Sequence, residues 1–398
     1  VPLLLGRADL VLPMLVGAAM GMLIDLFMLY GLFDSRLFPG SAPWPVGVAA
    51  AEAIRAGDKG GRRRTVLGLG AIAGAVGSSG LFGLSRHLFG IAGVPMSAFG
   101  IACIGDIGAL SMFGVGLLLR AYSPGLLGID LAERFVPHGI MIGAGLVALV
   151  QASVKVTGRS AATREQHEGF GRTRSTQTAR RALISGFTLY VGAACLLAVI
   201  GGLVSEMSGA RLFFWVVFAA IACIAAELIV GFSAMHAGWF PAFATALLFL
   251  LAASLLGFPP VAAALLVGFV ASGGPAFADA GFDFKTGWCL RGFGENGAFE
   301  LEGRKQQLLS AVIGLLVGLV MVGFFHDLYF GRDLFPPVAR VYAATIQTGV
   351  DPSLGKTLLL WAVPGALIQF LGKDRQLGIL LGTGLLVLNG AAGWVVLG

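Results

Sequence analysis

The stretch VAAALLVGFVASGGPAFADAGFDFKTGWCLRG, residues 261–292, joins an apolar run to a group of charged residues. Its first twelve residues are apolar or small, and a Gly-Gly-Pro step follows at residues 273–275. Asp279, Asp283 and Lys285 then occur at spacings of four and two. A long apolar run that ends at charges is typical of a helix that crosses a bilayer.

The composition of the whole chain indicates the same class of protein. Of its 398 residues, 57% are hydrophobic and 12% are charged, whereas soluble domains carry about 25% charged residues. The 61 glycines suit close contact between helices in lipid. The four cysteines show no CxxC spacing, so no disulfide framework is expected. We attribute the net charge of +6 to cytoplasmic loops, and not to nucleic-acid binding.

We therefore predict an all-α fold, a polytopic transmembrane helical bundle with re-entrant or broken helices. Apolar stretches near the length that a spanning helix needs recur along the whole chain. The expected spans are 10–33, 65–84, 98–119, 137–157, 183–204, 211–233, 241–257, 260–282, 307–330, 357–371 and 377–397.

Three loops concentrate positive charge and are predicted to lie in the cytoplasm. Residues 57–64, 158–181 and 285–305 together hold 14 of the 27 Lys and Arg residues. Two loops on one side require an even number of spans between them, but three fall between the first and second. We therefore expect the stretch 94–127 to hold either a span with a re-entrant piece or two short spans.

The sequence also contains an apparent internal repeat. The step Leu-Phe-Pro at 37–39 recurs at 334–336, and in both places a short Ala-rich helix follows. We divide the chain into a first repeat, residues 1–182, which ends in the basic loop 158–182, and a second repeat, 183–398. The predicted orientation makes the repeats inverted, as in many secondary transporters. The pairing also predicts that the first repeat lacks about 100 residues before Val1, as in a fragment or a shortened homologue.

Acidic residues within or beside the spans are the first functional candidates. An ionised carboxylate at the centre of a spanning helix costs roughly 2.5–3.5 kcal/mol. For Asp25 and Asp279 we favour a position facing an internal cavity. For Asp106 and Glu227, a functional role and a role as an ordinary acid at a helix end both stay open.

The Gly-Gly-Pro step is expected to break the helix. Pro275 has no N–H to donate and clashes with the preceding turn, and Gly273 and Gly274 lower helix propensity further. A broken helix at membrane depth is where transporters commonly hold substrates and ions. These three residues are therefore included in the predicted translocation site.

The acids that follow the step lie one helical turn apart. Asp279 and Asp283 would share a face, where each disfavours ionisation of the other. Lys285 is expected to oppose this effect and to hold one of them ionised. A protonatable pair suits proton coupling, and a helix end neutralised at the cytoplasmic surface is an equally good explanation of the spacing.

Two further stretches carry candidates. Residues 41–57 form a helix too short to span, with prolines at its start, beside Trp44, and with Glu52 and Arg55 three apart. This helix either dips into the membrane or lies on its surface. His236 precedes another proline, although a single histidine there is more often a packing residue than a ligand.

No signature of a cofactor, metal or nucleotide site is present. The five histidines are scattered without an HExxH motif, and the GKT at 355–357 lacks the upstream glycine of a phosphate-binding loop. We therefore predict no catalytic, cofactor or metal-binding residues.

Four segments resemble the oligopeptide transporter superfamily, which includes the yellow-stripe-like transporters of metal chelates. They are PWPVGVAAAEAIRAGDKGG (43–61), GDIGALSMFGVGLLL (105–119), PHGIMIGAGLVALVQ (137–151), and ADAGFDFKTG with GRKQQLLSAVIG (278–287 and 303–314). The family's Asp–apolar–Lys–Thr–Gly motif falls on Asp283, Phe284, Lys285, Thr286 and Gly287, with Asp279 also at a family position.

The chain departs from the family's pattern in three ways. Phe282 stands where glutamine is common, the connection 291–303 lacks the usual proline, and the further N-terminal spans of family members are absent. The third departure agrees with the block that the repeat predicts to be missing.

The resemblance implies a proton-driven secondary transporter of peptides or metal chelates in the cell membrane, plasma or inner. Its partners would be a small peptide or metal-chelate substrate, protons and the lipid bilayer. Homo-oligomerisation stays open. The alternatives are an intramembrane enzyme, for which no nucleophile–base or metal constellation is visible, and a truncated remnant or structural subunit that does not transport.

Overall fold

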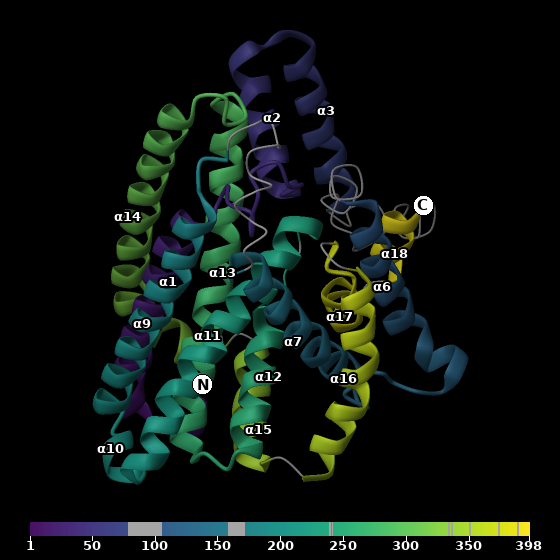
Figure 1. Cartoon of the computed structure of the whole chain (residues 1–398). Coiled ribbons are helices and arrows are strands. Elements are labelled where there is room, and N and C mark those ends of the chain that lie inside the picture. The colour runs from purple at the N-terminus through teal and green to yellow at the C-terminus, as the bar shows by residue number, and fades with distance from the viewer. Residues whose placement is uncertain are drawn as a thin grey trace.

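The computed structural model is α-helical in the part of the chain that it describes (Figure 1). The β-structure in the described residues is one isolated bridge between Phe33 and Phe38. Seven helices are long and apolar enough to cross a membrane. The prediction of an all-α polytopic bundle is confirmed. The described residues are 1–78, 106–157 and 172–398, without 239, 241, 333–334, 336, 350–351, 373–374 and 388–389.

The described helices, in chain order, are α1 (Val11–Leu32), α2 (Pro45–Lys59), α3 (Gly61–Ser78), α6 (Ile107–Leu127), α7 (Val136–Thr157), α9 (Thr176–Ile200), α10 (Leu203–Glu206), α11 (Gly209–Ala237), α12 (Ala242–Leu255), α13 (Pro260–Leu290), α14 (Gly297–Phe330), α15 (Pro337–Thr348), α16 (Pro352–Gly372), α17 (Leu377–Leu386) and α18 (Gly390–Leu397). Two 3₁₀ turns, Leu3–Leu5 and Ala8–Leu10, precede α1.

The last predicted span is corrected by the structure. Residues 377–397 form two short helices, α17 and α18, where a single spanning helix was expected. At 1.5 Å per residue, the ten residues of α17 cover about 15 Å, roughly half of the hydrocarbon thickness. An Asn-Gly pair at 389–390 is the turn signal between the two helices that the hydropathy pattern hides.

Two of the predicted basic loops are also corrected, because most of their residues are helical. Only Gly60 separates α2 from α3, and only residues 291–296 separate α13 from α14. Asn296 caps α14 by accepting the Phe299 N–H at 3.1 Å. Lys, Arg and Glu are good helix formers, so a helix need not end where the apolar run ends. Of the remaining predicted loop, 158–181, residues 158–171 lie outside the described part.

The stretch 94–127 is only partly described. From Ile107 onward it is one helix, α6, which continues through Arg120 and Pro124. Residues 107–127 are therefore a single helix, and residues 94–105 of this stretch lie outside the described residues.

The predicted break at Gly273-Gly274-Pro275 is wrong as well. Helix α13 runs without interruption from Pro260 to Leu290, with Pro275 inside it. The glycines instead let neighbouring helices approach. A Cβ at Gly274 would lie 2.9 Å from Ala242 Cβ of α12. Tertiary packing on all sides of α13 outweighs the local helix-breaking tendency.

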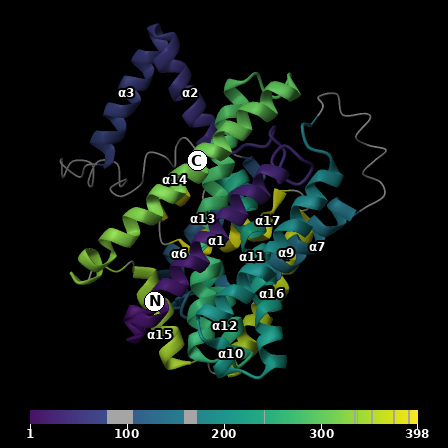
Figure 2. The ribbon, with the colours of Figure 1, turned by 90° about the vertical axis from the view of Figure 1, so that its left-hand side faces the viewer.

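Helices α11 and α13 form the centre of the bundle. Within their most apolar windows, 67% and 72% of the residues are buried, against 6% for α14, which lies at the outer edge (Figures 1 and 2). Helices α1 and α9 pack against the central pair on one side, and α7 and α16 form a tight pair on the other. Side chains from α1, α9, α11 and α13 can therefore meet at the centre of the bundle.

Close glycine contacts hold the second side together, as the glycine content suggested. A Cβ at Gly143 of α7 would overlap the Ala362 carbonyl of α16, and a Cβ at Gly365 would overlap the Ile140 carbonyl. Backbones thus touch where no side chain intervenes, which is the packing that small residues permit in lipid.

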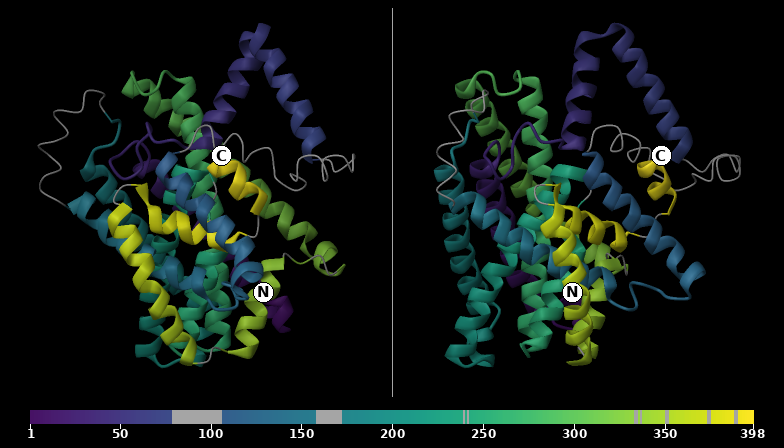
Figure 3. Two further views of the ribbon diagram at one scale, coloured as in Figure 1. Left: turned by 90° about the vertical axis from the view of Figure 1, so that its right-hand side faces the viewer. Right: turned by 45° about the vertical axis from the view of Figure 1, so that its right-hand side comes forward.

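The hairpin of α2 and α3 projects from one end of the bundle (Figure 3). The end of α13 and the start of α14 lie at that same end. The order long helix, short helix, long helix of α1–α3 recurs in α14–α16. The inverted repeat nevertheless stays a prediction, as do the division into 1–182 and 183–398 and the missing block.

Candidate translocation site

Two acids that the sequence singled out separately meet in the centre of the bundle. Asp25 of α1 and Glu227 of α11 are 0% and 1% exposed. A Cβ placed on Gly273 of α13 would overlap both Asp25 Oδ2 and Glu227 Oε1. The two carboxyl groups therefore converge on one position, which is open only because residue 273 is glycine.

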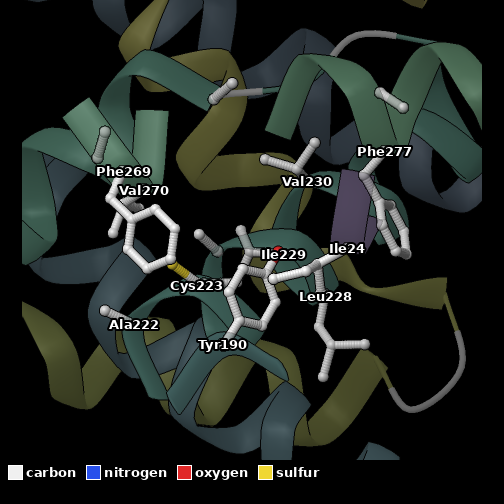
Figure 4. Close-up of a cluster of buried hydrophobic side chains, with 14 of the residues drawn as sticks. Ile24, Tyr190, Ala222, Cys223, Leu228, Ile229, Val230, Phe269, Val270 and Phe277 are labelled. Carbon is white, nitrogen blue, oxygen red and sulfur yellow. The ribbon is translucent and has the colours of Figure 1, made fainter. Parts of the chain in front are cut away.

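The surroundings of this carboxyl pair are otherwise apolar. The Tyr190 hydroxyl of α9 donates a hydrogen bond to Asp25 Oδ1. The ring of Phe269 stands edge-on to the Tyr190 ring, with centroids 5.7 Å apart. Figure 4 shows Tyr190, Cys223 and Phe269, from three helices, in the same cluster of buried side chains. Water is therefore largely excluded from the pair.

Three of the four carboxyl oxygens have no hydrogen-bond partner within the described residues. They are Asp25 Oδ2 and both oxygens of Glu227. No Lys, Arg or His in the described part forms an ion pair with either acid. Buried acids are normally paired or hydrogen-bonded, so two ionised carboxylates in this arrangement would be costly.

Asp279 and Asp283 lie on a different face of α13. Their side chains are exposed, whereas Phe277, Ala280 and Phe284 between and beside them are buried. Since α13 is helical through both acids, they share one face, as their spacing predicts. Neither forms an ion pair within the described residues.

Lys285 does not act as the counter-ion that we expected. Its side chain is buried, and Nζ donates to the carbonyls of Gly40 at 2.7 Å and Ala42 at 3.0 Å. It also lies 4.4 Å from the ring centroid of Trp288. A spacing of two residues places Lys285 and Asp283 on opposite faces of a helix, which is why the sequence interpretation failed.

Lys285 and Thr286 instead attach the loop before α2 to α13. Thr286 Oγ1 donates to the Gly47 carbonyl at 3.1 Å, and Arg55 of α2 donates to the Cys289 carbonyl. The segment from Gly40 to Arg55 is therefore held along the last two turns of α13. Glu52 points outward and forms an ion pair with Arg55 at 2.6 Å.

Trp44 fixes the same segment from its other side. It is fully buried and has the left-handed backbone conformation, with φ 40°. Its backbone N–H donates to the Met235 carbonyl of α11 at 2.8 Å. A Cβ on Gly281 would overlap its indole ring. His236, the next residue of α11, is also buried.

Asp106 lies apart from this centre. It caps α6, where its side chain accepts the Ala109 N–H at 2.9 Å. Because α6 packs mainly against α17 and α18, Asp106 is not brought to the carboxyl pair.

A buried ionic network near the start of α14 was missed by the sequence interpretation. Arg304 and Glu300 are both fully buried and 2.9 Å apart, and Arg291 adds a second bond to Glu300 at 2.8 Å. Arg304 also donates to the Phe33 carbonyl, and Asp34 accepts from Thr173. The spacing of four between Glu300 and Arg304 was the available signal.

Tyr190 and Cys223 were missed for a different reason. Each is an ordinary residue in an apolar run, and nothing in the sequence places it beside an acid from another helix.

The described residues contain no group of three or more His, Cys, Asp or Glu side chains that could hold a metal ion. No curated protein and no solved structure matches the chain. The family model described as OPT oligopeptide transporter protein matches residues 127–397, more than half of the chain. The chain therefore belongs to the OPT family of oligopeptide transporter proteins.

Proposed function

We propose that this chain carries oligopeptides, or metal complexes of peptide-like chelators, across the cell membrane by secondary transport coupled to protons. Membership of the family supports membrane transport of oligopeptide-type substrates. The driving ion, the preference between peptide and chelate, and the plasma or inner membrane as location belong to the proposal.

The exposed aspartate pair on α13 is the observation that carries the proposal. Helix α13 is long and apolar enough to span, yet Asp279 and Asp283 are exposed on one of its faces. An acid that faces lipid costs up to roughly 2.5–3.5 kcal/mol, which is the value for the centre of a span, and less toward the membrane surface. This face of α13 is therefore better suited to water and a polar solute than to acyl chains.

The substrate class fits the charge of this face. A peptide presents an N-terminal ammonium group, and a metal chelate presents amine and metal charge, either of which a carboxylate pair can bind. The anchored segment from Gly40 to Arg55 packs along the same end of α13, where it would border the solute path.

Uptake into liposomes tests the proposal. The chain is reconstituted, a pH gradient is imposed, and entry of a labelled tetrapeptide is measured. We expect uptake to follow the gradient and to fall at least tenfold in Asp279→Asn or Asp283→Asn. Asp327→Asn is the matched control, because this aspartate side chain is 90% exposed on α14. Uptake that ignores both the gradient and the α13 substitutions would contradict the proposal.

Competition identifies the substrate class. Unlabelled tri- to pentapeptides are compared with ferric and nickel chelates as inhibitors of the same uptake. Inhibition by peptides alone selects the peptide transporter, and inhibition by chelates alone selects the chelate transporter. Turnover of a peptide or lipid without any vectorial movement would favour the intramembrane enzyme instead.

A further inference from the structure

The Asp25–Glu227 pair lies near the middle of every helix that surrounds it. Gly273 is close to the centre of the 31-residue α13, and Tyr190 is close to the centre of the 25-residue α9. Helices of this length exceed the hydrocarbon thickness, so their centres lie deep in the membrane. Ionisable residues at that depth commonly form ion pathways and proton relays.

Two bare negative charges do not fit this position. Both carboxyl groups are buried and border the same point, so each would repel the other in a medium of low dielectric constant. The single hydrogen bond from Tyr190 to Asp25 stabilises one charge at most. A proton shared between the two groups turns the repulsion into a hydrogen bond between a carboxylic acid and a carboxylate.

A metal cation fits less well than a proton. Hard cations take six or more oxygen ligands, whereas the described surroundings supply two carboxyl groups and one phenol among apolar side chains. Ile24, Cys223 and Phe269 are among the buried side chains of the cluster in Figure 4.

We propose that Asp25 and Glu227 form a binding site for the proton that drives transport, separate from the aspartates that face the solute. The proposal rests on the proposed function for the coupling role alone. Asp279 is six residues beyond Gly273, about 9 Å further along α13 and on another face. Proton and solute would then meet the same helix at two heights, so that movement of α13 couples them.

Few other titratable groups face this site. Within the described residues, the other titratable groups are Tyr190 from α9 and Cys223 from α11. Helix α1 contributes Asp25 itself, and α13 contributes Gly273, which has no side chain to titrate. No basic side chain of the described part is among them. The protonation of the pair should therefore depend on the two carboxyl groups and on the Tyr190 hydrogen bond.

Infrared spectroscopy of the full chain in lipid bilayers tests the site without any substrate. A protonated carboxylic acid has a carbonyl stretching band that a carboxylate lacks, and the band shifts on transfer to D₂O. At neutral pH we expect a band that is lost in Glu227→Gln and in Asp25→Asn. Glu206→Gln is the matched control, since this acid on α10 is exposed and should leave the band unchanged.

Tyr190→Phe provides a second, milder variant. It removes only the hydroxyl that donates to Asp25 Oδ1, so the band should shift in frequency and remain present. This measurement decides the matter if the acid substitutions prevent folding. Where the acid variants fold, an unchanged band in both would overturn the site; where they do not, an unchanged band in Tyr190→Phe would. A band that disappears on replacing choline by sodium at constant ionic strength would also overturn it.

Uptake measurements test the coupling role separately from the existence of the proton site. In Glu227→Gln, peptide flux driven by its own gradient should persist, and stimulation by the pH gradient should be lost. Full stimulation in this variant would overturn the coupling role. Failure of the wild type to transport any peptide would instead contradict the proposed function, while the infrared result would still stand for the site.

Discussion

The positive charge of Lys285 lies inside the protein, where it binds backbone carbonyls. Its ammonium group satisfies two backbone carbonyls of the segment before α2 and lies against the Trp288 ring. Because an ammonium group has three N–H donors, one lysine can attach a loop that has no regular secondary structure of its own. The family motif around it is thus used for attachment, while the acid at its start faces outward.

Lys285→Met should destabilise the protein. It leaves the Gly40 and Ala42 carbonyls buried without their donor, at a cost of about 1–3 kcal/mol each. The midpoint of thermal unfolding in detergent should therefore fall clearly below that of the wild type. Lys305→Met, at an exposed lysine of α14, should leave it unchanged. Equal midpoints for both variants would show that the attachment contributes nothing to stability.

Gly281 shows the same dependence on close contact. A Cβ there would overlap the indole ring of Trp44, which is buried and held on both sides. Gly281→Ala should cost about 1–3 kcal/mol, as overpacking usually does. Gly192→Ala on α9, where a Cβ meets open space, should be neutral or slightly stabilising. Thermal unfolding of the pair measures the difference, and an unaffected Gly281→Ala would mean that Trp44 can move aside.

Among the elements, the start of α14 is held by charge, and most of the rest of this helix is not buried. Arg304 and Glu300 are buried in the first turns, whereas the apolar window beyond them is 6% buried. The ionic network joins α14 to the loop after α1 and to the segment before α9. It therefore determines where α14 begins, while lipid or another surface must cover the remainder.

Glu300→Gln should loosen this end of α14. Removal of one partner from a buried ion pair commonly costs about 3–5 kcal/mol, because the other charge stays buried. Glu302→Gln, two residues further on at an exposed position, should have little effect. Hydrogen exchange of the first turns of α14 should rise in the first variant alone. Unchanged protection there would show that packing, and not the ion pair, holds the helix.

On the scale of the whole molecule, the basic segments predict the orientation. The α2–α3 hairpin and the connection 291–296, which belong to two of the three Lys/Arg-rich segments, lie at the same end of the bundle (Figure 3). Helix α9 leads away from that end, and α10 follows it at the opposite end.

Cysteine labelling checks this orientation. In a Cys195→Ser background, Gly60→Cys and Glu295→Cys should react with a membrane-impermeant maleimide only from the cytoplasmic side. Ser205→Cys, in the exposed α10, should react only from the other side. Labelling of all three positions from one side would contradict the predicted topology.

The sequence alone was sufficient for the class of fold and for most of its spans. Low charge and repeated apolar runs leave few alternatives to a helical bundle in lipid, since backbone groups there must be satisfied within each helix. It was also sufficient for singling out Asp25 and Glu227 as acids within or beside apolar runs, although for Glu227 a place at an ordinary helix end stayed open.

Only the tertiary structure decided which of these residues meet. The continuity of α13 through Pro275, the inward direction of Lys285 and the contact of Asp25 with Glu227 all depend on neighbouring helices that are distant in sequence. Hydropathy and local spacing describe one helix at a time. The position and partner of a side chain are fixed by how the helices pack, so the carboxyl pair beside Gly273 could be found only once four helices were assembled around it.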